Sequence, residues 1–215
     1  MIQALRKLVT FDEFVAQYPD NPQRRYELHD GVIVEMAQPV GDHEEVVGFL
    51  ATKITLEYSR LNLPYFIPKT VFVKPLENES AYSPDVLILN QPNLVNEPLW
   101  KKASTVSQAA SIPLVVEVVS TNWRDDYHKK YANYVGRSPS RRVQMGISEY
   151  WIVDYAALGG REFIGKPKQL TILVCCLEEG EYLINKFRGN DRIQSPTFPE
   201  LNLTAEQIFR AGVVS

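Results

Sequence analysis

The chain has 215 residues, of which 45% are hydrophobic and 23% charged, and its formal net charge is −3. This length fits one large domain with a full core. No run of residues approaches the roughly 18 apolar positions that a membrane span needs, and the overall charge argues against a generally basic nucleic-acid-binding protein.

Two further features bear on the compartment. The N-terminal residues, MIQALRKLVTFDEF, are interrupted by charge and lack the apolar core of a signal peptide. Cys175 and Cys176 are adjacent on a predicted strand and point to opposite faces, so they cannot form a relaxed disulfide with each other. We therefore expect a cytoplasmic protein with no membrane partner.

The N-terminal third predicts a helix, a hairpin and a second helix. Residues Thr10–Tyr18 read as a short helix whose first residue caps it and whose Glu13 completes a capping box. Alternating apolar residues flank Asp30-Gly31 in RYELHDGVIVEM, which is a strong hairpin signal. Helical spacing of apolar residues then predicts a long helix over about His43–Asn62.

The middle of the chain predicts strands. Short ones are expected at Tyr65–Phe66, Thr70–Val73 and Asp85–Leu89, with the last two joined by a hairpin loop. The proline-containing segment Asn90–Ser111 is expected to be mostly loop. Leu114–Val119 is uninterrupted by polar residues except at Glu117, which predicts a strand covered on both faces.

The C-terminal third adds four elements. They are a helix at about Trp123–Val135, a strand at Glu149–Asp154, a hairpin over Leu170–Lys186 that turns at Glu179-Gly180, and a short helix at Thr204–Arg210. The helix between the second and third apolar strands makes a βαβ crossover.

This element order predicts the α/β class, with a central mixed β-sheet flanked by helices. We expect a single domain over residues 1–215. Within it, an N-terminal helix and hairpin occupy 10–40, a core 43–155, and a C-terminal hairpin and short helix 168–210.

Two carboxylates in apolar strands carry the chemical signal. A buried charge is costly unless it is paired, hydrogen-bonded or bound to a metal. Glu117 shares a strand face with Val115 and Val119. If Asp85 on a neighbouring strand faces the same way, the two carboxylates come within reach of one cation, and paired hard oxygen ligands suit Mg²⁺ or Mn²⁺. Alternatively, either residue is a strand-edge carboxylate held by backbone donors.

Lys130 completes the constellation. Helical side chains lean toward the helix N-terminus, so a lysine two turns into the helix can reach back toward the carboxylates. Asp126, Lys130 and Tyr134 fall on one helix face, whereas Lys129 points away toward solvent or phosphate. The alternative for Asp126 and Lys130 is a simple ion pair between residues four apart.

Basic residues gather directly after the carboxylate strands. Six basic and two acidic residues lie between Arg124 and Arg142, a local charge of +4. A phosphate would need positive charge at this place, although a solvated helix and loop would have the same composition.

These residues support a family resemblance. RYELHDGVIVEM, DHEEVVGFL, SPDVLIL, PLVVEVVS, NWRDDYHKK and GISEYWIVDY together resemble the Uma2 family of restriction-type endonucleases, common in cyanobacteria and part of the PD-(D/E)xK nuclease superfamily. The resemblance spans about Thr10 to Phe209. It implies a restriction-endonuclease-like core, with Asp85 and Glu117 as metal ligands.

The position of the lysine departs from the superfamily motif. That motif has a lysine two residues after the glutamate, where this chain has Val119. The family pattern instead places the lysine on the following helix, which matches Lys130. The resemblance also implies site roles for Glu27 and for His43, as a phosphate or water contact. By position alone, Glu27 could be an ordinary strand residue and His43 a surface or capping residue.

A second departure is an apparent insertion of about eight residues, GRSPSRRV, at 136–143. Its Arg141 and Arg142 are candidates for phosphate contacts, which would make binding more sensitive to salt. A surface loop with no role is the alternative.

The mechanistic hypothesis is hydrolysis of DNA phosphodiester bonds. A divalent ion held by Asp85, Glu117 and the Val118 carbonyl would polarise the phosphate and activate water, while Lys130 would orient that water and offset developing charge. The resemblance further implies a homodimer. The rivals are a catalytically inactive DNA-binding or interaction module with the same fold, and a hydrolase of small phosphorylated molecules.

Overall fold

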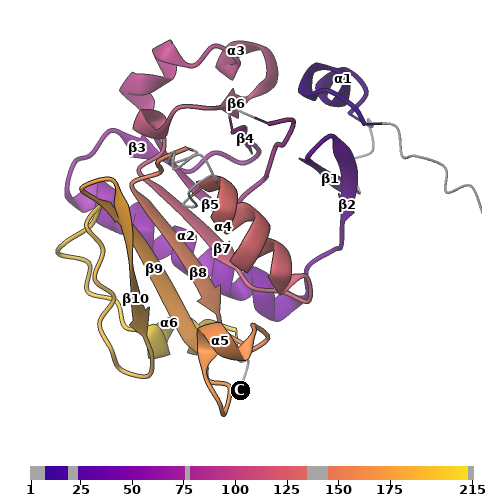
Figure 1. Cartoon of the computed structure of the whole chain (residues 1–215). Coiled ribbons are helices and arrows are strands. Elements are labelled where there is room, and N and C mark those ends of the chain that lie inside the picture. The colour runs from indigo at the N-terminus through magenta and orange to yellow at the C-terminus, as the bar shows by residue number, and fades with distance from the viewer. Residues whose placement is uncertain (1–7, 19–23, 76–77, 135–144, 213–215) are drawn as a thin grey trace, which may run out of the picture.

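The structure, a computed structural model, describes residues 8–18, 24–75, 78–134 and 145–212. Its centre is a six-stranded sheet in the order β10-β9-β8-β7-β5-β3 (Figure 1). The strands are β3 (Tyr65–Phe66), β5 (Val86–Asn90), β7 (Leu114–Val118), β8 (Glu149–Asp154), β9 (Thr171–Glu178) and β10 (Glu181–Phe187). Strands β7 and β8 are parallel and every other neighbouring pair is antiparallel, which confirms the predicted mixed sheet.

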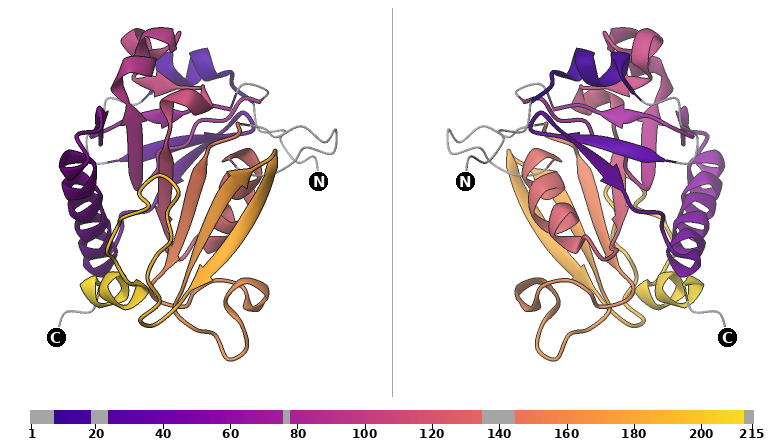
Figure 2. Two further views of the ribbon diagram at one scale, coloured as in Figure 1. Left: turned by 90° about the vertical axis from the view of Figure 1, so that its left-hand side faces the viewer. Right: turned by 90° about the vertical axis from the view of Figure 1, so that its right-hand side faces the viewer.

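Helices cover both faces of this sheet. The long helix α2 (Gly41–Arg60) and the C-terminal α6 (Ala205–Ala211) pack on one face, against a core that includes Val116 and Val118. The opposite face, with Val115 and Val119, packs against a helical segment after β7 and against α5 (Arg161–Ile164). Figure 2 shows these layers edge-on, with α2 and α6 across the sheet from α4 (Tyr131–Tyr134). Because both faces are covered, the strand sequences are apolar at consecutive positions.

The N-terminal elements form a smaller layer beside the sheet (Figure 1). Helix α1 (Phe11–Ala16) has the predicted capping box between its N-cap threonine and Glu13. Strands β1 (Arg25–His29) and β2 (Val32–Met36) form the predicted antiparallel hairpin. Its turn residues have φ of 49° and 79°, the left-handed conformations that an Asp-Gly turn supplies.

The hairpin predicted between Thr70–Val73 and Asp85–Leu89 is wrong. Strand β4 (Phe72–Val73) pairs in parallel with β6 (Thr105–Val106), outside the central sheet. Val73 also bridges to Tyr82, so the chain turns back before β5 begins. The apolar pattern located both strands, but a two-residue strand carries too little of it to specify its partner.

The segment Asn90–Ser111 holds more structure than the predicted loop. It contains the 3₁₀ turns η1 (Gln91–Asn96) and η2 (Ala109–Ser111), the single-turn helix α3 (Trp100–Ala103) and strand β6. Such short elements lack the periodicity that identifies a helix in sequence.

The helix predicted at Trp123–Val135 is a composite. A π-helical segment, η3 (Asp125–Lys130), leads into α4, and Val135 lies outside the described residues. π-Turns are rare and occur often at functional sites.

The C-terminal hairpin turns at Glu179-Gly180 as predicted, and its strands β9 and β10 extend the central sheet. Helix α6 forms with its own capping box at Thr204. Within the part of the chain that is described, no helix has the length and apolar character to cross a bilayer.

Candidate active site

The antiparallel pair β5–β7 brings the two predicted carboxylates together. Val86 lies opposite Val116 in this pair, so continuing the register by one residue places Asp85 opposite Glu117. Asp85 immediately precedes β5, and Glu117 is the penultimate residue of β7. Since directly opposed side chains of an antiparallel pair share a face, both carboxylates lie at the end of β7 where η3 follows.

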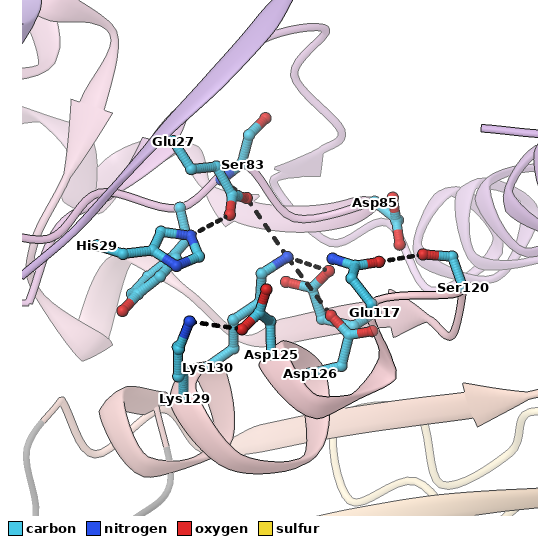
Figure 3. Close-up of polar contacts among 12 residues, drawn as sticks. Glu27, His29, Ser83, Asp85, Glu117, Ser120, Asp125, Asp126, Lys129 and Lys130 are labelled. Atoms are coloured by element: carbon cyan, nitrogen blue, oxygen red, sulfur yellow. Dashed lines mark hydrogen bonds and ion pairs between the residues drawn. The ribbon is translucent and has the colours of Figure 1, made fainter. Parts of the chain in front are cut away.

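Lys130 lies at the centre of the site (Figure 3). Its Nζ is 3.0 Å from Glu117 Oε2, 3.4 Å from Glu27 Oε1 and 3.6 Å from Asp126 Oδ1. All four side chains are buried. Lys130 therefore leans back from η3 as predicted. It contacts Glu117 and Glu27 as well as Asp126, so the alternative of a simple ion pair with Asp126 is wrong.

The β1–β2 hairpin contributes Glu27 to this cluster. One Glu27 oxygen accepts a hydrogen bond from the Ser83 backbone N–H, at 3.0 Å, and the other lies 2.8 Å from His29 Nε2. Glu27 thus reaches the site through Lys130, and it is a buried cluster residue rather than an ordinary strand residue. Its neighbour His29 was not singled out from the sequence, although the alternation of a strand places residues 27 and 29 on one face.

Asp85 is held from the other side. It accepts a hydrogen bond from the Val118 N–H at 2.8 Å and lies 3.5 Å from His43 Nε2. The same His43 nitrogen is 3.0 Å from the Val118 carbonyl oxygen. His43 is buried at the start of α2, so the alternative of a surface histidine is wrong, while Asp85 keeps 16% of its side chain exposed.

The positive charge of Lys130 is strongly stabilised. Burial alone would lower its pKa, but Glu117, Glu27 and Asp126 outweigh burial and hold the pKa well above the usual value. Burial would likewise raise the pKa of Glu27, yet Lys130 together with the hydrogen bonds from His29 and Ser83 lowers it. Lys130 and Glu27 are therefore a charged pair.

The remaining carboxylates are under-compensated. Burial raises the pKa of Glu117 well above its usual value, and Lys130 offsets this only in part while Asp85 and Asp126 add to it. Burial also raises the pKa of Asp126 to about 7. One buried lysine thus serves more carboxylates than it can neutralise, and such a cluster favours an additional cation.

A cavity of about 140 Å³ opens onto this cluster. Asp85, Glu117, Val118, Asp126, Lys130 and His43 are among the residues that line it. Glu117 Oε1 is buried without a hydrogen-bond partner among the described residues, although Oε2 is held by Lys130. A buried carboxylate oxygen with no donor is costly, and a cation would satisfy it.

The donor set fits a hard divalent ion that keeps part of its water shell. In the described parts of the chain, no three His, Cys, Asp or Glu side chains are arranged to hold a metal on their own. Two carboxylates and one backbone carbonyl leave the other positions to water or phosphate, as Mg²⁺ prefers. A larger hollow of about 610 Å³, bordered by Phe66 and Trp100, has no carboxylate among its described lining residues.

Of the predicted phosphate contacts, the structure describes Lys129, and it lies outside this cluster. Lys129 is exposed and its Nζ is 2.8 Å from Asp125 Oδ1, which makes it one half of a surface ion pair. Arg141, Arg142 and the apparent insertion at 136–143 lie outside the described residues.

Comparisons with known proteins bear on the family and the fold. A family model described as "Uma2: Putative restriction endonuclease" matches residues 11–206. The crystal structure of a putative nuclease belonging to DUF820 from Anabaena variabilis ATCC 29413 superposes with a TM-score of 0.67 at 15% identity, covering 95% of this chain and 99% of that one. At this identity the match shows a shared fold. A search of curated proteins finds no match.

Proposed function

Since the chain belongs to the Uma2 family, described as restriction endonucleases, we propose that it is a divalent-metal-dependent endonuclease that hydrolyses DNA phosphodiester bonds. The observation that carries this proposal is that Glu117 lines the same cavity as Asp85 and has one buried oxygen, Oε1, with no hydrogen-bond partner among the described residues, while Lys130 holds its other oxygen.

Mg²⁺ or Mn²⁺ would be held by Asp85, Glu117 and the Val118 carbonyl. The carbonyl already lies beside His43 Nε2, but a carbonyl oxygen has two lone pairs and can accept a second partner. When bound, such an ion supplies a Lewis acid for the phosphate and a water of lowered pKa.

The protein's own residues position the ligands and supply charge. Lys130 fixes the orientation of Glu117 and carries positive charge close to where a phosphate would react. Glu27 and His43 act as positioning residues in this proposal, Glu27 by holding Lys130 and His43 by holding Asp85. With these contacts in place, the carboxylates need no rearrangement when the substrate arrives.

DNA as the substrate rests on the family description rather than on any base-reading feature. We also propose a homodimer, because two paired sites would cut the two strands of a duplex. Sedimentation of the purified protein with and without duplex DNA tests the dimer separately from the chemistry.

A cleavage assay tests the catalytic proposal. Single-stranded, duplex and branched DNA are incubated with Mg²⁺ or Mn²⁺ and with the wild type, Asp85→Asn, Glu117→Gln or Lys130→Ala. We expect metal-dependent cleavage by the wild type and none by the three variants. Lys102→Ala removes an exposed lysine on α3 and serves as the control that keeps activity.

Three outcomes would replace this proposal. Cleavage that persists in all three purified variants would place the chemistry elsewhere. A wild type that binds DNA without cleaving it would be the inactive binding module, and hydrolysis of nucleotides but not DNA would make the protein a small-molecule phosphohydrolase.

A further inference from the structure

Carboxyl groups outnumber cationic groups among the described residues that line the cavity at the site, although the proposed substrate is an anionic phosphodiester. Asp85, Glu117 and Asp126 line it. Lys130 also lines it, but its ammonium group already contacts Glu27, Glu117 and Asp126. Even with a divalent ion bound, a substrate strand has a neighbouring phosphate on each side of the reacting one, and these need a cation that is not already paired.

Arg25 is a cation of this kind on the cavity wall. It lines the cavity together with Met36, the residue opposite it in the β1–β2 hairpin. Because strand side chains alternate, Arg25 shares a face with Glu27, which contacts Lys130. Two residues along a strand span about 6.5 Å, so the exposed Arg25 on the cavity wall lies close to Glu27, which is buried and contacts Lys130.

The charge of Arg25 is uncompensated. Its side chain is exposed and has no carboxylate partner among the described residues. The preceding residue provides the contrast, since Arg24 Nη1 lies 2.9 Å from Glu35 Oε2. Glu35 is opposite Tyr26 in the hairpin, so this ion pair lies on the face turned away from the cavity. The two adjacent arginines thus lie on opposite faces of the hairpin, and of the two, Arg24 has a carboxylate partner among the described residues.

We propose that Arg25 binds a phosphate of the nucleic-acid substrate, namely one next to the reacting phosphate on the same strand. A guanidinium group can bind two phosphate oxygens through parallel hydrogen bonds, and its charge does not depend on pH in the working range. Arg25 thereby sets the position of the strand over Asp85 and Glu117, a role for which the sequence pattern had suggested Lys129. This inference rests on the proposed nuclease function.

The test compares Arg25→Ala with Arg24→Ala. The second variant removes the same charge from the adjacent residue, which lies on the opposite face of the hairpin. Binding of labelled single-stranded and duplex DNA is measured over a series of salt concentrations without divalent metal, and kcat and KM with Mg²⁺ or Mn²⁺. We expect Arg25→Ala to weaken binding and raise KM about tenfold, with kcat changed less than about twofold. The slope of log K against log salt should fall by about 0.7–0.9.

The control variant Arg24→Ala should change binding and KM less than about twofold, as expected for an exposed ion pair. Arg25→Lys keeps the charge without the planar fork and should recover part of the affinity. If the wild type cleaves DNA and the two variants Arg25→Ala and Arg24→Ala show equal binding and KM, the proposed role of Arg25 is overturned while the nuclease function stands. A wild type that neither binds nor cleaves nucleic acid would overturn the proposed function and this inference with it.

Discussion

Glu117 and Glu149 begin as near equivalents. They lie on the neighbouring parallel strands β7 and β8, and their exposed fractions are 1% and 0%. Glu149 Oε1 accepts from Trp151 Nε1 at 2.5 Å, and its Oε2 accepts from Ser195 Oγ and the Thr197 N–H. Glu117 instead has a charged partner at one oxygen and, among the described residues, no partner at the other. The two carboxylates are therefore equally buried, but both oxygens of Glu149 accept hydrogen bonds, whereas in the part of the chain that the structure describes only one oxygen of Glu117 does.

Asp154, at the end of β8, repeats the Glu149 pattern. Its oxygens accept from the N–H groups of Leu158 and Gly159 and from the Tyr127 hydroxyl. Gly159 permits this approach, since a Cβ there would come within 2.8 Å of Asp154 Oδ2. Glu149 and Asp154 are thus both satisfied by neutral donors, whether these come from nearby residues such as Leu158 and Gly159 or from a distant segment such as Ser195. A spare oxygen beside a buried lysine is what distinguishes the carboxylate of a candidate site.

Glu117→Gln should show the largest difference between the candidate metal ligand and the fully hydrogen-bonded carboxylates Glu149 and Asp154. We expect metal-dependent DNA cleavage to fall by about 1,000-fold or more, because a ligand of the metal is lost. The melting temperature should not fall, because burial already disfavours the charged form of Glu117 and Lys130 retains Glu27 and Asp126. Cleavage rates and thermal unfolding measure the two effects, and a variant that unfolds early while its folded fraction cleaves normally would contradict this assignment.

Lys130→Met tests whether the cluster depends on its single buried cation. Removing the ammonium leaves Glu27, Glu117 and Asp126 without a counter-charge, which should lower the free energy of unfolding by about 3–5 kcal/mol. Lys129→Met is the matched control, because it removes only the exposed pair with Asp125 and should cost about 0.3–0.5 kcal/mol. Urea unfolding of both variants measures the difference, and equal losses would show that the cluster is not held by Lys130.

Glu149→Gln should have the opposite signature to Glu117→Gln. The amide nitrogen cannot accept a hydrogen bond, so at least one donor among Trp151, Ser195 and Thr197 is left unpaired, at a cost of about 1–3 kcal/mol in stability. Cleavage per folded molecule should stay unchanged. A large loss of cleavage by a folded Glu149→Gln protein would place this carboxylate in the site and remove the distinction.

The core of the candidate site was predictable from the sequence because it rests on short-range rules. A charge inside an apolar strand identified Glu117, and the lean of helical side chains identified Lys130. The resemblance to a family added Glu27 and His43. The charge rule alone does not distinguish Glu117 from Glu149, because two of the three donors that satisfy Glu149 come from residues 46 and 48 positions away.

The parts that sequence reasoning missed depend on pairing between segments. The partner of β4 is β6 rather than β5, and no local pattern encodes that choice. The π-helical turn that carries Lys130 has no sequence signature of its own. Arg25 could have been found, since alternation places it on the face of Glu27, but only once Glu27 was known to face the site.

The binding of Mn²⁺, measured by titration calorimetry, tests the central distinction most directly. The wild type and Glu149→Gln should bind the ion with similar affinity, whereas Glu117→Gln and Asp85→Asn should lose most of it, because each replaces one of the two carboxylates among the three ligands that we propose. Binding by Glu117→Gln at the affinity of the wild type, or no binding by the wild type, would contradict the claim that the spare oxygen of Glu117 marks a metal site.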